Sequence, residues 1–102
     1  MPAEPRRAIL LRHSDADGQN IERLIHQHSL AVVYTIATDT AVPRLAVMMA
    51  AQYVAENRAE VVIIPHLTRK DIWASREWRA LAELVDVVIA DGTVIDAEFA
   101  QP

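Results

Sequence analysis

Side chains that could do chemistry gather at the two points where long apolar runs stop. The run "AILLR" at residues 8–12 ends in an arginine and is followed by a histidine and a serine, and the run "EVVIIP" at 60–65 is followed by "HLTRKD". The side chains placed in this way are Arg12, His13, Ser14, His66, Arg69 and Lys70. Arginine binds phosphate and carboxylate as a fork, and a serine beside a histidine could act as a nucleophile with its base.

The elements that must position these side chains follow from the pattern of apolar residues. Continuous apolar runs at 8–12, 31–37, 61–65 and 86–90 predict buried strands, and "TVIDA" at 93–97 predicts a short fifth strand that pairs back after the Asp91-Gly92 turn. Helices are expected at about 18–29 and at 72–84. Another is expected to start at a cap by Asp39 or Thr40, with Pro43 in its first turn, and to run to about Asn57. This alternation is typical of an α/β fold, here a small three-layer α/β/α domain with a mainly parallel four- to five-stranded sheet in flavodoxin-like order.

Two of the predicted helices carry apolar side chains whose burial can be anticipated. The helix over 43–57 should be well buried, because its bulky side chains cover more than half of its circumference; they are Leu45, Val47, Met48, Met49, Tyr53 and Val54. On the helix over 72–84, Trp78 lies on the apolar stripe and Trp73 lies off it. We therefore expect Trp78 in the core and Trp73 at the surface, where it is a candidate interface anchor.

A parallel sheet of this kind binds its ligands beyond the carboxyl ends of its strands. If the first and third strands are neighbours, the loops that follow them flank the point where the strand order reverses. One rim would then hold His13, Ser14, His66, Thr68, Arg69 and Lys70, and all of these except Thr68 are candidate anion-binding residues. Each also has a simpler interpretation: Ser14 as a helix cap, the histidines as solvated loop residues, and Arg69 and Lys70 as surface charges.

Composition and charge narrow the classes of function. The 102 residues fit one domain, for which we expect loose termini over 1–7 and 97–102. A net charge of −4 argues against a stand-alone nucleic-acid binder, so DNA contact should be weak or made through a partner. The absence of cysteine, of metal-ligand spacing and of a glycine-rich phosphate loop predicts no metal and no cofactor. No segment resembles a signal peptide or a membrane span, which favours a cytoplasmic protein without membrane contact.

The opening segment "ILLRHSDADGQN" resembles the start of the catalytic domain of serine recombinases, the resolvase/invertase family. That family has an apolar strand, then Arg-x-Ser, a polar turn and a glutamine, and Arg12 and Ser14 match its arginine and its nucleophilic serine. Gln19 matches the glutamine with an offset of one residue. The resemblance spans about residues 7–96 in element order. It implies a DNA strand-exchange enzyme with Ser14, Arg12 and Arg69 as catalytic residues.

The second part of the resemblance is incomplete. The family has Leu-Asp-Arg-x-x-Arg after a later strand, and in "EVVIIPHLTRKDIW" Leu67 and Arg69 match the leucine and the first arginine. Thr68 replaces the aspartate, and Ile72 stands in the place of the second arginine. A third family arginine has no counterpart in register, and Arg44 only lies nearby. The dimerisation helix and helix-turn-helix domain that follow in the family have no counterpart in "TVIDAEFAQP".

Three functions remain open on these observations. The first is a degenerate resolvase-like domain that is inactive alone and acts as an accessory interaction module in DNA recombination or mobile elements, bound to a protein partner or to a second copy of itself. The second is an active serine recombinase that exchanges or nicks DNA strands through Ser14. The third is an unrelated small α/β domain that binds a ligand or a protein, including one similar to a response regulator.

Overall fold

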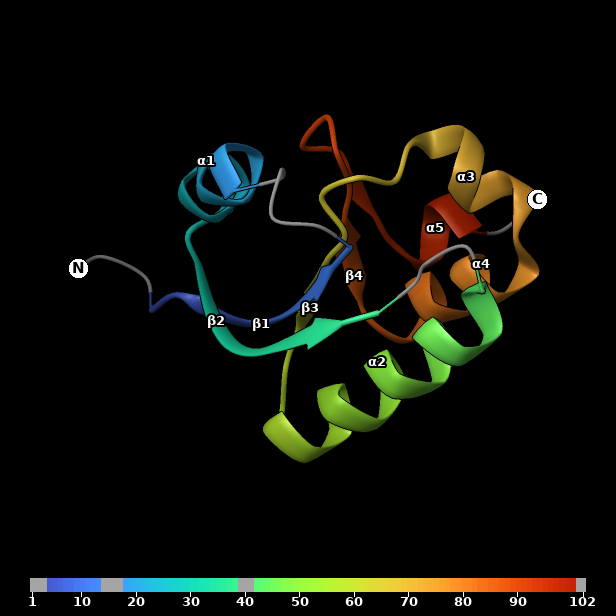
Figure 1. Ribbon diagram of the computed structural model, residues 1–102, viewed down its shortest axis with the longest axis horizontal. Helices are drawn as coiled ribbons and strands as arrows, with labels where there is room; N and C mark the ends of the chain where they lie inside the picture. The colour runs from blue at the N-terminus through green and yellow to red at the C-terminus, as the bar shows by residue number, and fades with distance from the viewer. Residues whose placement is uncertain (1–3, 14–17, 39–41, 101–102) are drawn as a thin grey trace.

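The computed structural model describes residues 4–13, 18–38 and 42–100, and it shows a five-stranded sheet covered by helices on both faces (Figure 1). The strands are β1 (Arg6–Arg12), β2 (Leu30–Ala37), β3 (Val61–Ile63), β4 (Asp86–Val88) and β5 (Val94–Ile95). The helices are α1 (Gly18–His28), α2 (Pro43–Asn57), α3 (Arg69–Ala74), α4 (Arg76–Leu84) and α5 (Ala97–Ala100). No helix in these ranges is long and apolar enough to cross a membrane.

The strand order is β2-β1-β3-β4-β5, which confirms the predicted three-layer α/β fold in flavodoxin-like order. β1 pairs in parallel with β2 and β3, and β3 pairs in parallel with β4. β5 runs antiparallel to β4, as the predicted return after the Asp91-Gly92 turn requires. The order reverses between β1 and β3, so the loops after these two strands meet at the carboxyl edge of the sheet, where open α/β sheets generally bind their ligands.

The alternation of side chains along each strand divides the core into two layers. On β1, Ala8 and Leu10 pack toward α1, whereas Ile9 and Leu11 pack toward the layer that contains α2 and α4. Successive side chains of a strand point to opposite faces, so a strand that is covered on both faces must be apolar throughout. The layer under α2 and α4 holds the larger cluster, with Trp78 at 2% exposure as its largest buried side chain.

The predicted burial of α2 is wrong in its details. The residues of this helix that are fully buried are Ala46 and Ala50, whereas Leu45 and Met48 are 54% and 61% exposed. Two alanines four positions apart allow the helix axis to approach the sheet closely, because a methyl group leaves room for the large aliphatic side chains of the strands. Of the bulky residues, four are half-buried and pack against the larger cluster, namely Val47, Met49, Tyr53 and Val54, whereas Leu45 and Met48 lie on the exposed side of the helix.

The single helix predicted over 72–84 is also wrong, since two short helices occupy this segment. Ser75 has an extended backbone conformation (φ −122°, ψ 118°), which ends α3. Its hydroxyl accepts a hydrogen bond from the backbone N–H of Trp78, which caps the start of α4. Serine caps helix starts well because its side chain replaces a missing backbone partner. The tryptophan prediction is confirmed: Trp78 is buried and Trp73 is 44% exposed.

Parts of the two segments expected to be loose, 1–7 and 97–102, belong to regular elements, while residues 1–3, 101 and 102 lie outside the described residues. β1 begins at Arg6, whose Nη2 donates to Asp86 Oδ2 at 2.9 Å and whose Nε lies 3.6 Å from a Glu60 oxygen. At the other end, α5 covers residues 97–100. Charged residues at a strand end can pair across neighbouring strands, so their polarity does not exclude them from the sheet.

Candidate functional site

The carboxyl edge of the sheet brings the loops after β1 and β3 together. The rings of His13 and His66 lie with their centroids 5.3 Å apart and their planes at 35°. His13 is exposed and His66 is half-buried. Two residues separated by more than fifty positions thus meet where the strand order reverses, the place expected from the topology. Ser14 follows directly but lies outside the described residues.

Arg12 is the last residue of β1 and is half-buried, with its Nε atom shielded from solvent. Of the three candidate catalytic residues, Arg12 lies at the carboxyl end of the first strand.

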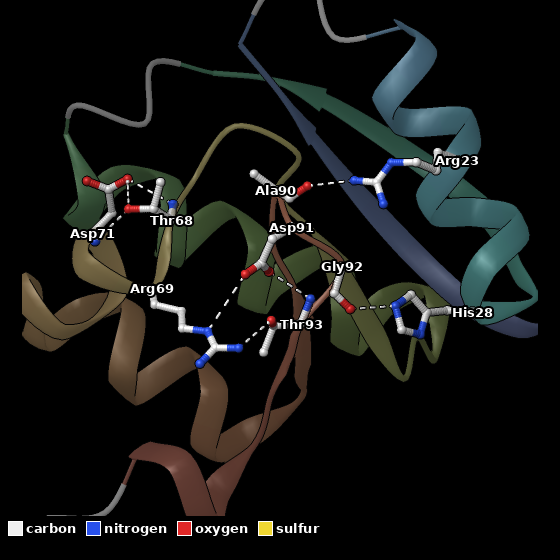
Figure 2. Close-up of polar contacts among 9 residues, drawn as sticks. All are labelled: Arg23, His28, Thr68, Arg69, Asp71, Ala90, Asp91, Gly92 and Thr93. Carbon is white, nitrogen blue, oxygen red and sulfur yellow. Dashed lines mark hydrogen bonds and ion pairs between the residues drawn. The ribbon is translucent and has the colours of Figure 1, made fainter.

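Arg69 stands at the start of α3 and is directed toward the turn after β4 (Figure 2). Its Nη2 donates to Thr93 Oγ1 at 3.0 Å, and its Nε lies 3.7 Å from Asp91 Oδ2. β4 is separated from β1 by β3, so the guanidinium lies beside the β4–β5 turn and not over the end of β1. An anion bound to Arg69 in this position would face the carboxylate of Asp91, which opposes binding.

The carboxylate of Asp91 is stabilised by the same turn. Hydrogen bonds from the hydroxyl and the backbone N–H of Thr93 hold the pKa of Asp91 below its ordinary value, and the charge of Arg69 adds to this effect. The backbone N–H of Thr93 donates to Asp91 Oδ1 at 2.9 Å. Bonds to the charged form of a carboxyl favour that form. At neutral pH the turn therefore keeps a negative charge beside Arg69.

At the start of α3, Thr68, which the resemblance puts in the place of the family's aspartate, serves as a helix cap. The backbone N–H of Thr68 donates to Asp71 Oδ2 at 2.9 Å, and the backbone N–H of Asp71 donates to Thr68 Oγ1 at 3.3 Å. This reciprocal pair is a capping box, which satisfies two otherwise unbonded donors at a helix start. Lys70, on the same turn, is exposed.

Ile72, which the resemblance aligns with the second arginine of serine recombinases, is completely buried. It belongs to the larger apolar cluster together with Leu67 and Trp78. A guanidinium at this position would have to enter a layer of aliphatic and aromatic side chains, and an unpaired buried charge is strongly disfavoured. The place of the missing arginine is therefore part of the core and not part of the rim.

Polar residues of α1 that the sequence analysis did not single out hold the same β4–β5 turn from the other side (Figure 2). Asn20 Nδ2 donates to the carbonyl oxygens of Pro65 and Ala90 at 2.9 and 3.2 Å, and Arg23 Nη2 donates to the Ala90 oxygen at 2.8 Å. His28 Nε2 lies 2.8 Å from the oxygen of Gly92. Asn20, Arg23 and Gln27 share one face of α1, where Arg23 also donates hydrogen bonds to Asn20 Oδ1 and Gln27 Oε1.

At the rim, Thr68 and Arg69 form hydrogen bonds within the chain. Among the described residues there is no group of three or more metal-ligating side chains and no enclosed pocket. Trp73 is exposed on α3, and its backbone oxygen accepts a hydrogen bond from Arg79 Nη1.

Comparisons with models of protein families, with curated proteins and with solved structures found no match. The function of the chain is therefore inferred from the chemistry of the rim and from the exposed side chains.

Proposed function

We propose that the chain is a resolvase-like domain that does not exchange DNA strands by itself and that serves as an accessory protein-binding module in DNA recombination. The observation that carries this proposal is the burial of Ile72. A serine that attacks a phosphodiester needs guanidinium groups around the charge that develops on the phosphate oxygens. The core position of residue 72 leaves that cluster without one of its members.

The surroundings of Arg69 support the same conclusion. Its guanidinium is held by Thr93 and lies close to the carboxylate of Asp91. Preorganised donors contribute to catalysis because they already point at the place where charge develops, and the loss of one such donor costs about 10²–10³ in rate. An arginine that first has to leave a carboxylate contributes less. Of the arginines that the resemblance implies, the second and third are therefore lacking, and Arg69 is engaged elsewhere.

Exposed apolar side chains favour a role in protein binding. Trp73, at 44% exposure on α3, combines a large contact area with low conformational entropy. Tryptophan is among the side chains that dominate binding energy at protein interfaces. With a net charge of −4, a protein surface is a better partner than duplex DNA.

Strand-exchange chemistry is tested directly by trapping the covalent intermediate. The protein is incubated with supercoiled plasmid, quenched with denaturant and examined for protein joined to 5′-phosphate ends, with Ser14→Ala as the matched control. We expect no adduct with either protein. An adduct formed by the parent chain and lost in Ser14→Ala would overturn the proposal and establish an active recombinase.

The binding role is tested with a purified full-length serine recombinase from the same genome. We expect Trp73→Ala to weaken association by more than about tenfold, as truncation of an interface anchor does. Leu84→Ala is the matched control, because Leu84 is also apolar and is 75% exposed. Equal affinity of the parent chain and Trp73→Ala, or no association at all, would remove this part of the proposal.

A further inference from the structure

β2 forms one edge of the sheet and is unusually open for an edge strand. In the strand order it has β1 as its neighbour on one side and no strand of the described chain on the other. Its eight residues, "LAVVYTIA", contain no charged side chain and no proline. Proteins commonly protect such edges with lysine, proline or inward-pointing charges, because the unpaired N–H and C=O groups otherwise accept another strand.

A bulge divides β2 and leaves one regular segment. Ala8 pairs with Val32 and Ile9 pairs with Tyr34, so Val33 is an extra residue in the ladder. From Tyr34 to Ala37 the pairing with β1 continues without interruption. A bulge bends the strand and discourages pairing along its whole length. The four residues after the bulge therefore form the part of the edge that can accept a further strand.

Side chains on both faces of this segment are compatible with a neighbour. Tyr34 stacks on Tyr53 of α2, with ring centroids 4.2 Å apart and planes at 14°, and it remains 41% exposed. Ile36 points to the same face and is buried, whereas Thr35 points to the opposite face and is exposed. A strand added here would cover the stacked tyrosines on one face and Thr35 on the other.

We infer that the occupant of this edge is β2 of a second copy, paired antiparallel about a two-fold axis near Thr35. A two-fold axis perpendicular to the sheet keeps each face on its own side, so Thr35 lies opposite its own equivalent and Tyr34 lies opposite Ile36 of the second copy. Threonine–threonine pairs and aromatic–β-branched pairs are favourable across strands. The segment is thus complementary to itself.

The rest of the surface suits a second copy as well. Two chains that each carry a net charge of −4 repel one another, but the edge that would meet contains no charge. α2 lies over β1 and β2, so the two α2 helices would be roughly 10–14 Å apart at the usual strand spacing. Tyr53 shares its flank of α2 with Met49 and Leu45, and the 54% exposed Leu45 could then contact the second copy.

The oligomeric state tests this inference, which does not depend on the proposed function. Light scattering after size exclusion should give twice the monomer mass of 11.4 kDa at roughly 100 µM protein. Thr35→Lys places a charge on the edge and should restore the monomer mass. Val94→Lys is the matched control on β5, at the opposite edge, and should leave the dimer intact. Circular dichroism establishes that both variants fold.

A cysteine cross-link tests the register, since the chain has no cysteine of its own. Thr35→Cys lies opposite itself in the proposed pair, so mild oxidation should give a disulfide-linked dimer in high yield. Val94→Cys should cross-link only at the slow rate of random collision. A parent chain that stays monomeric, a dimer that survives Thr35→Lys, or equal cross-linking at both positions would each overturn the inference.

Discussion

The two edge strands of the sheet, β5 and β2, differ in how far they are covered. β5 is two residues long, runs antiparallel to β4 and is followed at once by α5, which packs against α4 and β5. β2 is eight residues long, continues a parallel ladder and has an exposed tyrosine in its middle. Short strands covered by a helix offer few free backbone groups, whereas a long uncharged edge offers many. Packing within the chain protects the β5 edge, whereas the β2 edge is open to a partner strand.

The largest expected effect comes from removing the packing that supports the β5 side. Trp78→Ala should lower the free energy of unfolding by about 3–5 kcal/mol, because it deletes the largest buried side chain of the cluster that also contains Ile95. Urea denaturation measures this loss. Trp73→Ala is the control and should cost less than about 1 kcal/mol, since that side chain is half-exposed. Similar losses for the two variants would contradict the division between core and surface.

An intermediate effect is expected at the turn that leads into β5. Gly92 has a positive φ of 88°, and a Cβ atom there would lie 2.7 Å from Gln27 Oε1. Gly92→Ala should therefore destabilise the protein by about 1–3 kcal/mol. Gly18→Ala is the control, because a Cβ at Gly18 meets nothing within 4 Å. Adding Gln27→Ala to Gly92→Ala should recover the steric part of the loss and leave the part that is due to φ.

A smaller effect is expected at the open edge. Tyr34→Ala removes the stacking on Tyr53 and should cost about 0.5–1.5 kcal/mol. Thr35→Lys should change the stability of the monomer by no more than about 0.5 kcal/mol, because Thr35 is exposed. Thermal unfolding at low protein concentration measures both. A large loss in Thr35→Lys would mean that this edge also depends on packing within the chain, which would weaken the contrast with β5.

The smallest effect concerns the charge beside Arg69. The pKa of Asp91 is lowered, so its stabilising contribution is present above the ordinary carboxyl pKa and is lost as the pH falls through the lower pKa of the folded protein. Thr93→Val should raise the pKa of Asp91 more than Arg69→Met does, because the hydrogen bonds of Thr93 are the larger cause. An NMR titration of the carboxyl resonance measures the order, and the reverse order would show that the ion pair dominates.

Much of the fold was predictable because the strands are apolar runs with clear boundaries, and the parallel order followed from their alternation with helices. The burial of α2 was not, because Ala46 and Ala50 carry little hydrophobic bulk and are buried for reasons of close approach. The break at Ser75 had a signal. "TRKD" at 68–71 has the spacing of a capping box, which starts a first helix at Arg69. Ser75 is then available as the N-cap of a second helix.

For the candidate site, the edge of the sheet could be predicted from the sequence, but the side-chain contacts could not. Topology alone brings His13 and His66 to one edge, because it depends on strand order and not on side-chain detail. The direction of Arg69 depends on a turn more than twenty residues further along the chain, where Asp91 and Thr93 provide its partners. Spacing in the sequence carries no information on such a contact. The same holds for Asn20 and Arg23, whose acceptors are backbone oxygens.

The central place of β1 in the sheet sets an order of events during synthesis. β1 is made first, and it pairs with both β2 and β3. The unit β1-α1-β2 can form as soon as Ala37 has left the ribosome, whereas the other side of β1 has no partner until Val61 has been made. The edge of β2 is therefore complete while most of the chain is still missing, and β5 is added last. On a messenger that carries several ribosomes, adjacent nascent chains would present this same uncharged strand to one another before either is finished.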